Sequence, residues 1–226
     1  MRRRLAYILV SGVWFAVATS GHDVITTPLT FSREISRLVY ARCASCHRPG
    51  GRAFSLMTYA DARPWAAAIK EEVLERRMPP WGAVKGFGEF KDDQGLTQEQ
   101  IELIADWVEG GAPEGDPVLL PKTAEFPEER PRRVTPGIAV DGVLNLKTGI
   151  TLTGIQPQKV PDSGSVVVTA TRPDGSVEPL LWLYSYNPEF PHVYSYRTEI
   201  HLDAATRIEI MPRGAVVALL TRTPRN

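Results

Sequence analysis

The sequence predicts an α+β chain in which an all-α domain is followed by a small antiparallel β-sandwich-like domain. Three observations support this division. Apolar residues recur at helical spacing between residues 32 and 120, and short β-branched runs dominate after residue 137. Six prolines with mixed charges lie between residues 113 and 136, which is typical of a linker.

Three helices are expected in the first domain. The second is expected to stop before Pro79-Pro80, because proline cannot continue a helix. The third is expected to begin after Thr97 as N-cap, with Gln100 as its capping-box partner, and to end at Gly110-Gly111. The expected helices are residues 34–43, 64–77 and 98–109, with a Gly-rich loop at residues 82–95.

Strands are expected in the second domain, where Pro173-Asp174-Gly175 is a turn signal. Alternation along strands predicts that about half of six aromatic residues point inward: Trp182, Tyr184, Tyr186, Phe190, Tyr194 and Tyr196. The expected strands are residues 166–171, 180–184, 207–211 and 215–221.

The N-terminus predicts export. Arg2, Arg3 and Arg4 precede an apolar run from Leu5 to Ala18, so residues 1–20 are interpreted as a signal peptide. The alternative is an uncleaved membrane anchor, although the run is shorter than a typical span. Both interpretations place the remaining chain outside the cytoplasm, in the periplasm or secreted. The 26 basic and 26 acidic residues balance, which argues against a nucleic-acid partner.

The motif Cys43-Ala44-Ser45-Cys46-His47 is typical of covalent haem attachment. Two thiols three positions apart can reach the two vinyl groups of one porphyrin, and the next residue can then present its imidazole to the iron. Two alternatives are a C-x-x-C redox pair and a zinc site. A helix instead of a strand precedes the motif, and no second cysteine pair exists. The sequence therefore predicts one covalently bound haem c, with His47 as an iron ligand.

The second axial ligand is predicted to be Met78. It follows His47 by 31 residues, and Pro79-Pro80 hold the next backbone extended. A His/Met pair is a frequent ligation of haem c. The other candidates are Met57, Met211, His22, His192 and His201.

An apolar haem pocket is also expected, with hydrogen-bond donors for the two haem propionates. Tyr59, Trp65 and Trp81 are candidates for it, because these side chains bury a ring while still donating a hydrogen bond. Phe54, Leu56 and Phe87 lie in the same region, and Arg48 and Arg52 either pair with propionates or face water.

Four segments together resemble a family of bacterial cytochrome c domains: Cys43–Gly51, Tyr59–Ala66, Arg77–Trp81 and Ile104–Pro113. The resemblance covers about residues 30–120. It implies a cytochrome c-like all-α fold with Met78 as the distal ligand. Residues 121–136 are assigned as the Pro-rich linker from their composition.

Residues 137–226 resemble part of the carboxy-terminal lobe of copper type II, ascorbate-dependent monooxygenases, through Pro173–Gly175, Leu180–Tyr184 and Tyr194–Tyr196. That lobe carries copper on a His-x-His pair and a methionine. No His-x-His occurs here, and His192 and His201 lie nine residues apart. Copper is therefore not expected.

Three functions remain open. The first is an electron carrier that serves redox partner proteins and catalyses no reaction, because a haem with both axial positions filled has no open site for substrate. The second is a copper-dependent enzyme, or a relative of one, that uses His192, His201 and Met211. The third is a partner-docking module that carries the haem domain. A membrane contact is expected only if the N-terminal segment is uncleaved.

Overall fold

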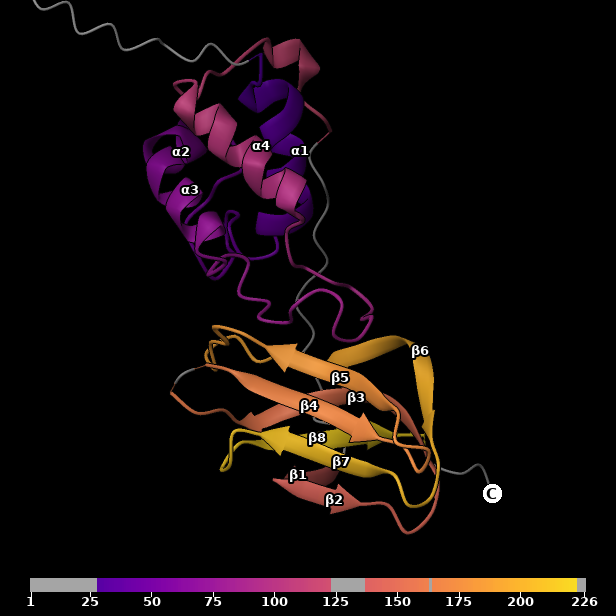
Figure 1. Ribbon diagram of the computed structural model, residues 1–226. Helices are drawn as coiled ribbons and strands as arrows, with labels where there is room; N and C mark the ends of the chain where they lie inside the picture. The colour runs from indigo at the N-terminus through magenta and orange to yellow at the C-terminus, as the bar shows by residue number, and fades with distance from the viewer. Residues whose placement is uncertain (1–27, 123–136, 163, 223–226) are drawn as a thin grey trace, which may run out of the picture.

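The computed structural model describes residues 28–122, 137–162 and 164–222, and Figure 1 shows a helical part that lies against two sheets. The predicted signal peptide, with His22 just after it, lies outside the described residues, as does most of the predicted linker. No helix among the described residues is long and apolar enough to cross a membrane.

Short helical elements make up the first part. The Thr97 side chain accepts a hydrogen bond from Gln100 N, and the Gln100 side chain accepts one from Thr97 N. The predicted capping box of α4 is therefore confirmed. The elements are the π-helical turn Phe31–Ile35, α1 (Ser36–Leu38), the π-helical turn Val39–Cys43, α2 (Tyr59–Ala62), the 3-10 turn Arg63–Trp65, α3 (Ala66–Leu74), α4 (Gln98–Glu109) and the 3-10 turn Pro117–Leu119.

An apolar cluster holds these elements together. Phe31, Ile104 and Trp107 lie at most 3% exposed within it, and the Trp107 indole donates to Pro113 O at 3.0 Å. Burial of such aromatic and aliphatic side chains is the main stabilising contribution in a small core. The helical part therefore has a core of its own.

Two four-stranded antiparallel sheets form the second part, in the orders β1-β8-β3-β6 and β2-β7-β4-β5. Their inner faces share one buried cluster, as expected for a sandwich in which alternate side chains point inward. The strands are β1 (Ile138–Asp141), β2 (Val143–Asn145), β3 (Ile150–Lys159), β4 (Val166–Thr171), β5 (Val177–Leu183), β6 (Tyr194–Leu202), β7 (Arg207–Met211) and β8 (Val216–Thr221).

The expected strands are all present, and β4 and β7 have the expected bounds. The turn at Pro173–Gly175 is confirmed, with Gly175 at a φ of 85° and Asp174 accepting from Ser176 N. Four strands were not expected, including the ten-residue β3, which carries Gly154 and Pro157 and shifts register beside both. Of the six aromatic residues, three are buried and three are not, as alternation predicted: Tyr186, Tyr194 and Tyr196 against Trp182, Tyr184 and Phe190.

One segment of the first part belongs to the sandwich core. We call residues 80–91 the bridging loop. Its backbone forms isolated bridges with an edge strand of each sheet, Ala83 with Leu183 on β5 and Phe90 with Tyr196 on β6. The loop thereby covers two sheet edges that would otherwise offer unpaired backbone groups.

The predicted fold class is wrong in its first half. Residues 30–120 are not an all-α, cytochrome c-like domain, because α1 and α2 have three and four residues and the longest helix has 12. Glycine and proline interrupt the helical pattern after the cysteines and after α3, and the bridging loop pairs with strands. Most of the regular structure lies in the two antiparallel sheets, with which the predicted β-sandwich-like domain is compatible.

We predict that Phe90→Ala destabilises the protein by about 3–5 kcal/mol, the usual cost of removing a buried phenylalanine. Phe90 is 5% exposed, and its ring centroid lies 5.4 Å from Tyr194 and 5.3 Å from Tyr196. Urea unfolding followed by circular dichroism measures the change. Leu74→Ala is the control, because Leu74 is 49% exposed on α3 and surface changes cost at most about 0.5 kcal/mol. Equal effects of the two variants would contradict the role of the bridging loop in the core.

Candidate haem-attachment site

The helical segment that begins at Phe31 delivers the first cysteine. Cys43 is the last residue of its π-helical turn, and Cys43 O accepts from both Cys46 N and His47 N, at 3.0 and 2.9 Å. One tight turn therefore presents Cys43, Cys46 and His47 together. Both thiols are free.

The two thiols have different surroundings. Cys43 packs against the apolar cluster of the helical part. Burial, and to a smaller extent the neighbouring Cys46, raise the pKa of Cys43 to about 12, although Arg42 lowers it. Cys43 is therefore a neutral thiol at physiological pH.

The His47 ring is oriented by the chain that folds back after the motif. Ala53 N donates to Cys46 O and Leu56 N donates to His47 O, both at 3.2 Å. This return places Phe54 O at 3.0 Å from His47 Nδ1, and the Phe54 ring packs edge-on against the imidazole at 4.9 Å. Since a carbonyl only accepts, Nδ1 carries the hydrogen, and the tautomer of the neutral ring that fits this bond has its lone pair on Nε2. Metal-binding histidines are usually held in this way.

The return of the chain depends on Gly51. A Cβ atom at this position would lie 2.3 Å from Cys46 O and 3.0 Å from Arg48 O, both backbone atoms. Only glycine permits this approach without a shift of the motif itself. Gly51 is therefore part of the site's construction.

The predicted pocket residues lie in three different places. Trp65 stacks on Phe54 at 4.5 Å beside His47, and both rings are about half exposed. Tyr59 lies in the helical core, where its hydroxyl donates to Ala112 O at 3.0 Å and its ring packs on Phe31. Trp81 is 4% exposed and belongs to the core of the sandwich.

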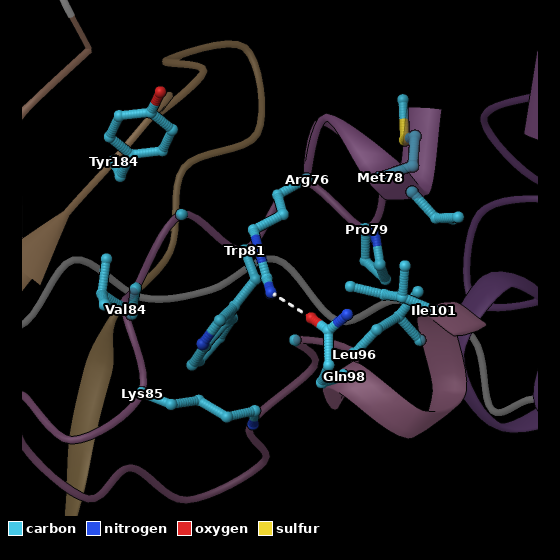
Figure 2. Close-up of a pocket in the computed structure, with 14 residues that line it drawn as sticks. Arg76, Met78, Pro79, Trp81, Val84, Lys85, Leu96, Gln98, Ile101 and Tyr184 are labelled. Atoms are coloured by element: carbon cyan, nitrogen blue, oxygen red, sulfur yellow. Dashed lines mark hydrogen bonds between the residues drawn. The ribbon is translucent and has the colours of Figure 1, made fainter. Parts of the chain in front are cut away.

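Met78 lines a cavity of about 410 Å³ between the helical part and the sheets. This volume lies in the range of about 300–1,000 Å³ that is usual for ligand pockets. Figure 2 shows Met78 and Ile101 on one side, with Trp81, Val84 and Tyr184 on the other. The cavity shares three lining residues with the apolar cluster against which Cys43 packs: Val73, Leu96 and Ile101. The cluster that contacts Cys43 thus extends to the cavity at Met78, but Cys43, Cys46 and His47 do not themselves line that cavity.

Two cations border the same cavity. Arg76 donates to Gln98 Oε1 at 3.0 Å, and Lys85 pairs with Asp93 at 2.7 Å (Figure 2 shows Arg76, Gln98 and Lys85). Arg48, one of the two arginines considered for propionates, instead donates to the backbone carbonyl of Ala44 at 3.0 Å, and Arg52 is exposed. The cationic groups at the cavity therefore come from segments other than the motif.

The other candidate ligands lie elsewhere. Met57 is buried in the helical part, and His192 Nε2 is bonded to Pro80 O at 2.9 Å. His201, near the end of β6, follows His192 by roughly 30 Å of extended chain at about 3.3 Å per residue. Met211 is half exposed on β7, in the other sheet. The three residues considered for copper are not brought together, and no group of three or more His, Cys, Asp or Glu that could hold a metal occurs in the described ranges.

Comparisons with protein-family models, with curated proteins and with solved structures found no match for this chain. The case for a function therefore depends on the chain's own residues.

Several residues of the region were not expected from the sequence. Tyr184, Lys85 and Gln98 line the cavity, and His192 and Tyr194 bond the backbone next to Met78. The sequence pattern marked His192 only as a candidate metal ligand, and Tyr184 and Tyr194 only as members of an aromatic set and of segments that carry a resemblance. Only the capping box that places Gln98 at the start of α4 was a usable signal.

We predict that Gly51→Ala disrupts the motif, because the added methyl group displaces Cys46 O. Expression with haem-attachment machinery should give at least about tenfold less covalent haem than the wild type, an estimate based on the loss of affinity when a ligand's support is removed. The matched control is Gly50→Asn. Gly50 has a φ of 72° but nothing within 4 Å of its Cβ position, and asparagine tolerates this conformation. Unchanged haem in Gly51→Ala would contradict the proposed packing.

Proposed function

We propose that Cys43 and Cys46 attach one haem through thioether bonds, that His47 and Met78 are its axial ligands, and that the protein transfers electrons to and from redox partner proteins. The observation that carries this proposal is the hydrogen bond from His47 Nδ1 to Phe54 O, beside two free thiols on the same turn. It leaves Nε2 available to a metal. The proposal also locates the mature protein in the periplasm or secreted, on the strength of residues 1–20.

Attachment requires little from the protein beyond placement. Each thiol adds across one vinyl group: the S–H bond and the vinyl π bond break, and an S–C and a C–H bond form. This addition needs no external oxidant. It requires both cysteines to be reduced, as they are here.

When bound, the haem supplies an iron that exchanges one electron between its ferric and ferrous states. The chain's residues then have separate tasks. Phe54 O holds the tautomer and orientation of His47. Leu96 and Ile101 are buried in the cavity wall beside Met78, and Arg76 and Lys85 at the same cavity would offer positive charge to the haem propionates. A methionine opposite histidine raises the reduction potential relative to two histidines.

We predict that the wild-type protein, made in a host with haem-attachment machinery, is red and keeps its haem in acid acetone. Cys43→Ala with Cys46→Ala should lose all haem under the same treatment, because no thioether then remains. Iron and covalent haem are quantified on the same sample. A colourless wild-type protein from such a host would contradict the proposal at its first step.

We also predict that Met78→Ala abolishes the weak far-red absorption band that a thioether sulfur gives to ferric haem. Its reduction potential should fall, since the thioether favours the ferrous state. Met57→Ala is the matched control, because Met57 is buried in the helical part and does not line the cavity. A band that survives Met78→Ala, or disappears in Met57→Ala, would show that another residue is the second ligand.

A further inference from the structure

We infer that the β-sandwich positions Met78, through hydrogen bonds from His192 and Tyr194 to the two backbone carbonyls that follow Pro79. The inference rests on the proposed role of Met78 as an iron ligand. It makes His192 and Tyr194 positioning residues, and it assigns a task to the second half of the chain.

The two bonds reach adjacent peptide groups. His192 Nε2 donates to Pro80 O at 2.9 Å, and the Tyr194 hydroxyl donates to Trp81 O. Both donors are buried, His192 at 9% and Tyr194 at 0% exposure. Burial strengthens such bonds and makes their loss costly, because an unpaired carbonyl then remains away from water.

Aromatic packing around Trp81 holds the same segment of the chain. The Trp81 ring centroid lies 5.1 Å from that of His192 and 4.9 Å from that of Tyr194, both edge-on. Such contacts add about 0.5–1.5 kcal/mol beyond burial. The start of the bridging loop is thus held by two hydrogen bonds and by the aromatic packing around one tryptophan.

This restraint acts close to Met78. The rings of Pro79 and Pro80 fix their φ angles. The backbone between Met78 and the hydrogen-bonded carbonyls of Pro80 and Trp81 therefore has little conformational freedom. On its other side, Met78 N donates to Glu72 O at 3.2 Å, which ties the residue to α3. Met78 therefore lies between one anchor in the helical part and one in the sandwich, and it lines the cavity that separates them.

Strand β6 offers a matched comparison. The Tyr196 hydroxyl, two residues beyond Tyr194, donates to Leu180 O at 2.9 Å, so both groups of that bond belong to the sandwich. Tyr196 is 1% exposed. Tyr194→Phe and Tyr196→Phe thus remove the same atom from the same strand at equal burial, but only the first bond reaches the bridging loop.

The experiment uses full-length haem-loaded protein and titrates ferric Tyr194→Phe and Tyr196→Phe with imidazole, which displaces a thioether ligand. Tyr194→Phe should lower the imidazole concentration at half displacement by about twofold to tenfold, the range that corresponds to one net hydrogen bond. It should also weaken the far-red band. Tyr196→Phe should match the wild type in both readouts, although urea unfolding shows a comparable loss of stability.

A second pair of variants tests His192. His192→Leu removes the donor to Pro80 O and should shift the titration in the same direction as Tyr194→Phe. His192→Gln keeps an N–H donor on a side chain of similar reach and should restore most of the wild-type value. Rescue by glutamine separates positioning from simple loss of packing.

The outcomes distinguish the two proposals. A wild-type protein without haem, or a Met78→Ala protein with an unchanged spectrum, overturns the proposed function. If wild type and Met78→Ala behave as proposed, but Tyr194→Phe and Tyr196→Phe give equal titrations, the positioning role alone is overturned.

Discussion

The structure depends on the burial of the bridging loop in the core of the β-sandwich. Trp81 and Phe90 come from the first half of the chain, yet both are at most 5% exposed among sandwich residues. Each buried aromatic side chain contributes about 1.5–3 kcal/mol, a large share of the net stability of a small domain. The loop also covers one edge strand of each sheet, through the bridges at Ala83 and Phe90. The two halves of the chain therefore form one packed unit at this point.

Backbone carbonyls orient the side chains of the candidate site. His47 is held by Phe54 O, and the chain after Met78 is held through Pro80 O and Trp81 O. A carbonyl in a packed segment is a fixed acceptor, whereas a surface ion pair loses much of its value to solvent and side-chain entropy. Orientation through the backbone in turn requires close approach of chain segments. Gly51 allows it at the motif, where any Cβ atom would meet Cys46 O.

Local signals predicted more of this structure than long-range ones. The capping box of α4 and the turn at Asp174 rest on interactions within a few residues, and the β-branched runs of β4 and β7 are local sequence patterns. All were found as expected. The all-α class failed because helical periodicity says nothing about chain between helices. The 82–95 loop was expected, but its pairing with β5 and β6 depends on residues about a hundred positions away. For the same reason the motif marked Cys43 and His47, while nothing local indicated that His192 and Tyr194 bond Pro80 O and Trp81 O.

The bridging loop also constrains how the two halves can change together. Loosening the sandwich near β6 frees Pro80 O and Trp81 O, and the restraint on the chain beside Met78 is lost with them. Loosening α3 frees the other side, where Glu72 O accepts from Met78 N. Both restraints would favour the proposed role of Met78 as an iron ligand, because a freely moving thioether pays an entropic cost each time it binds. On the proposed assignment, the sandwich needs no metal or substrate of its own to matter for electron transfer. It lowers the cost of holding one sulfur atom in place.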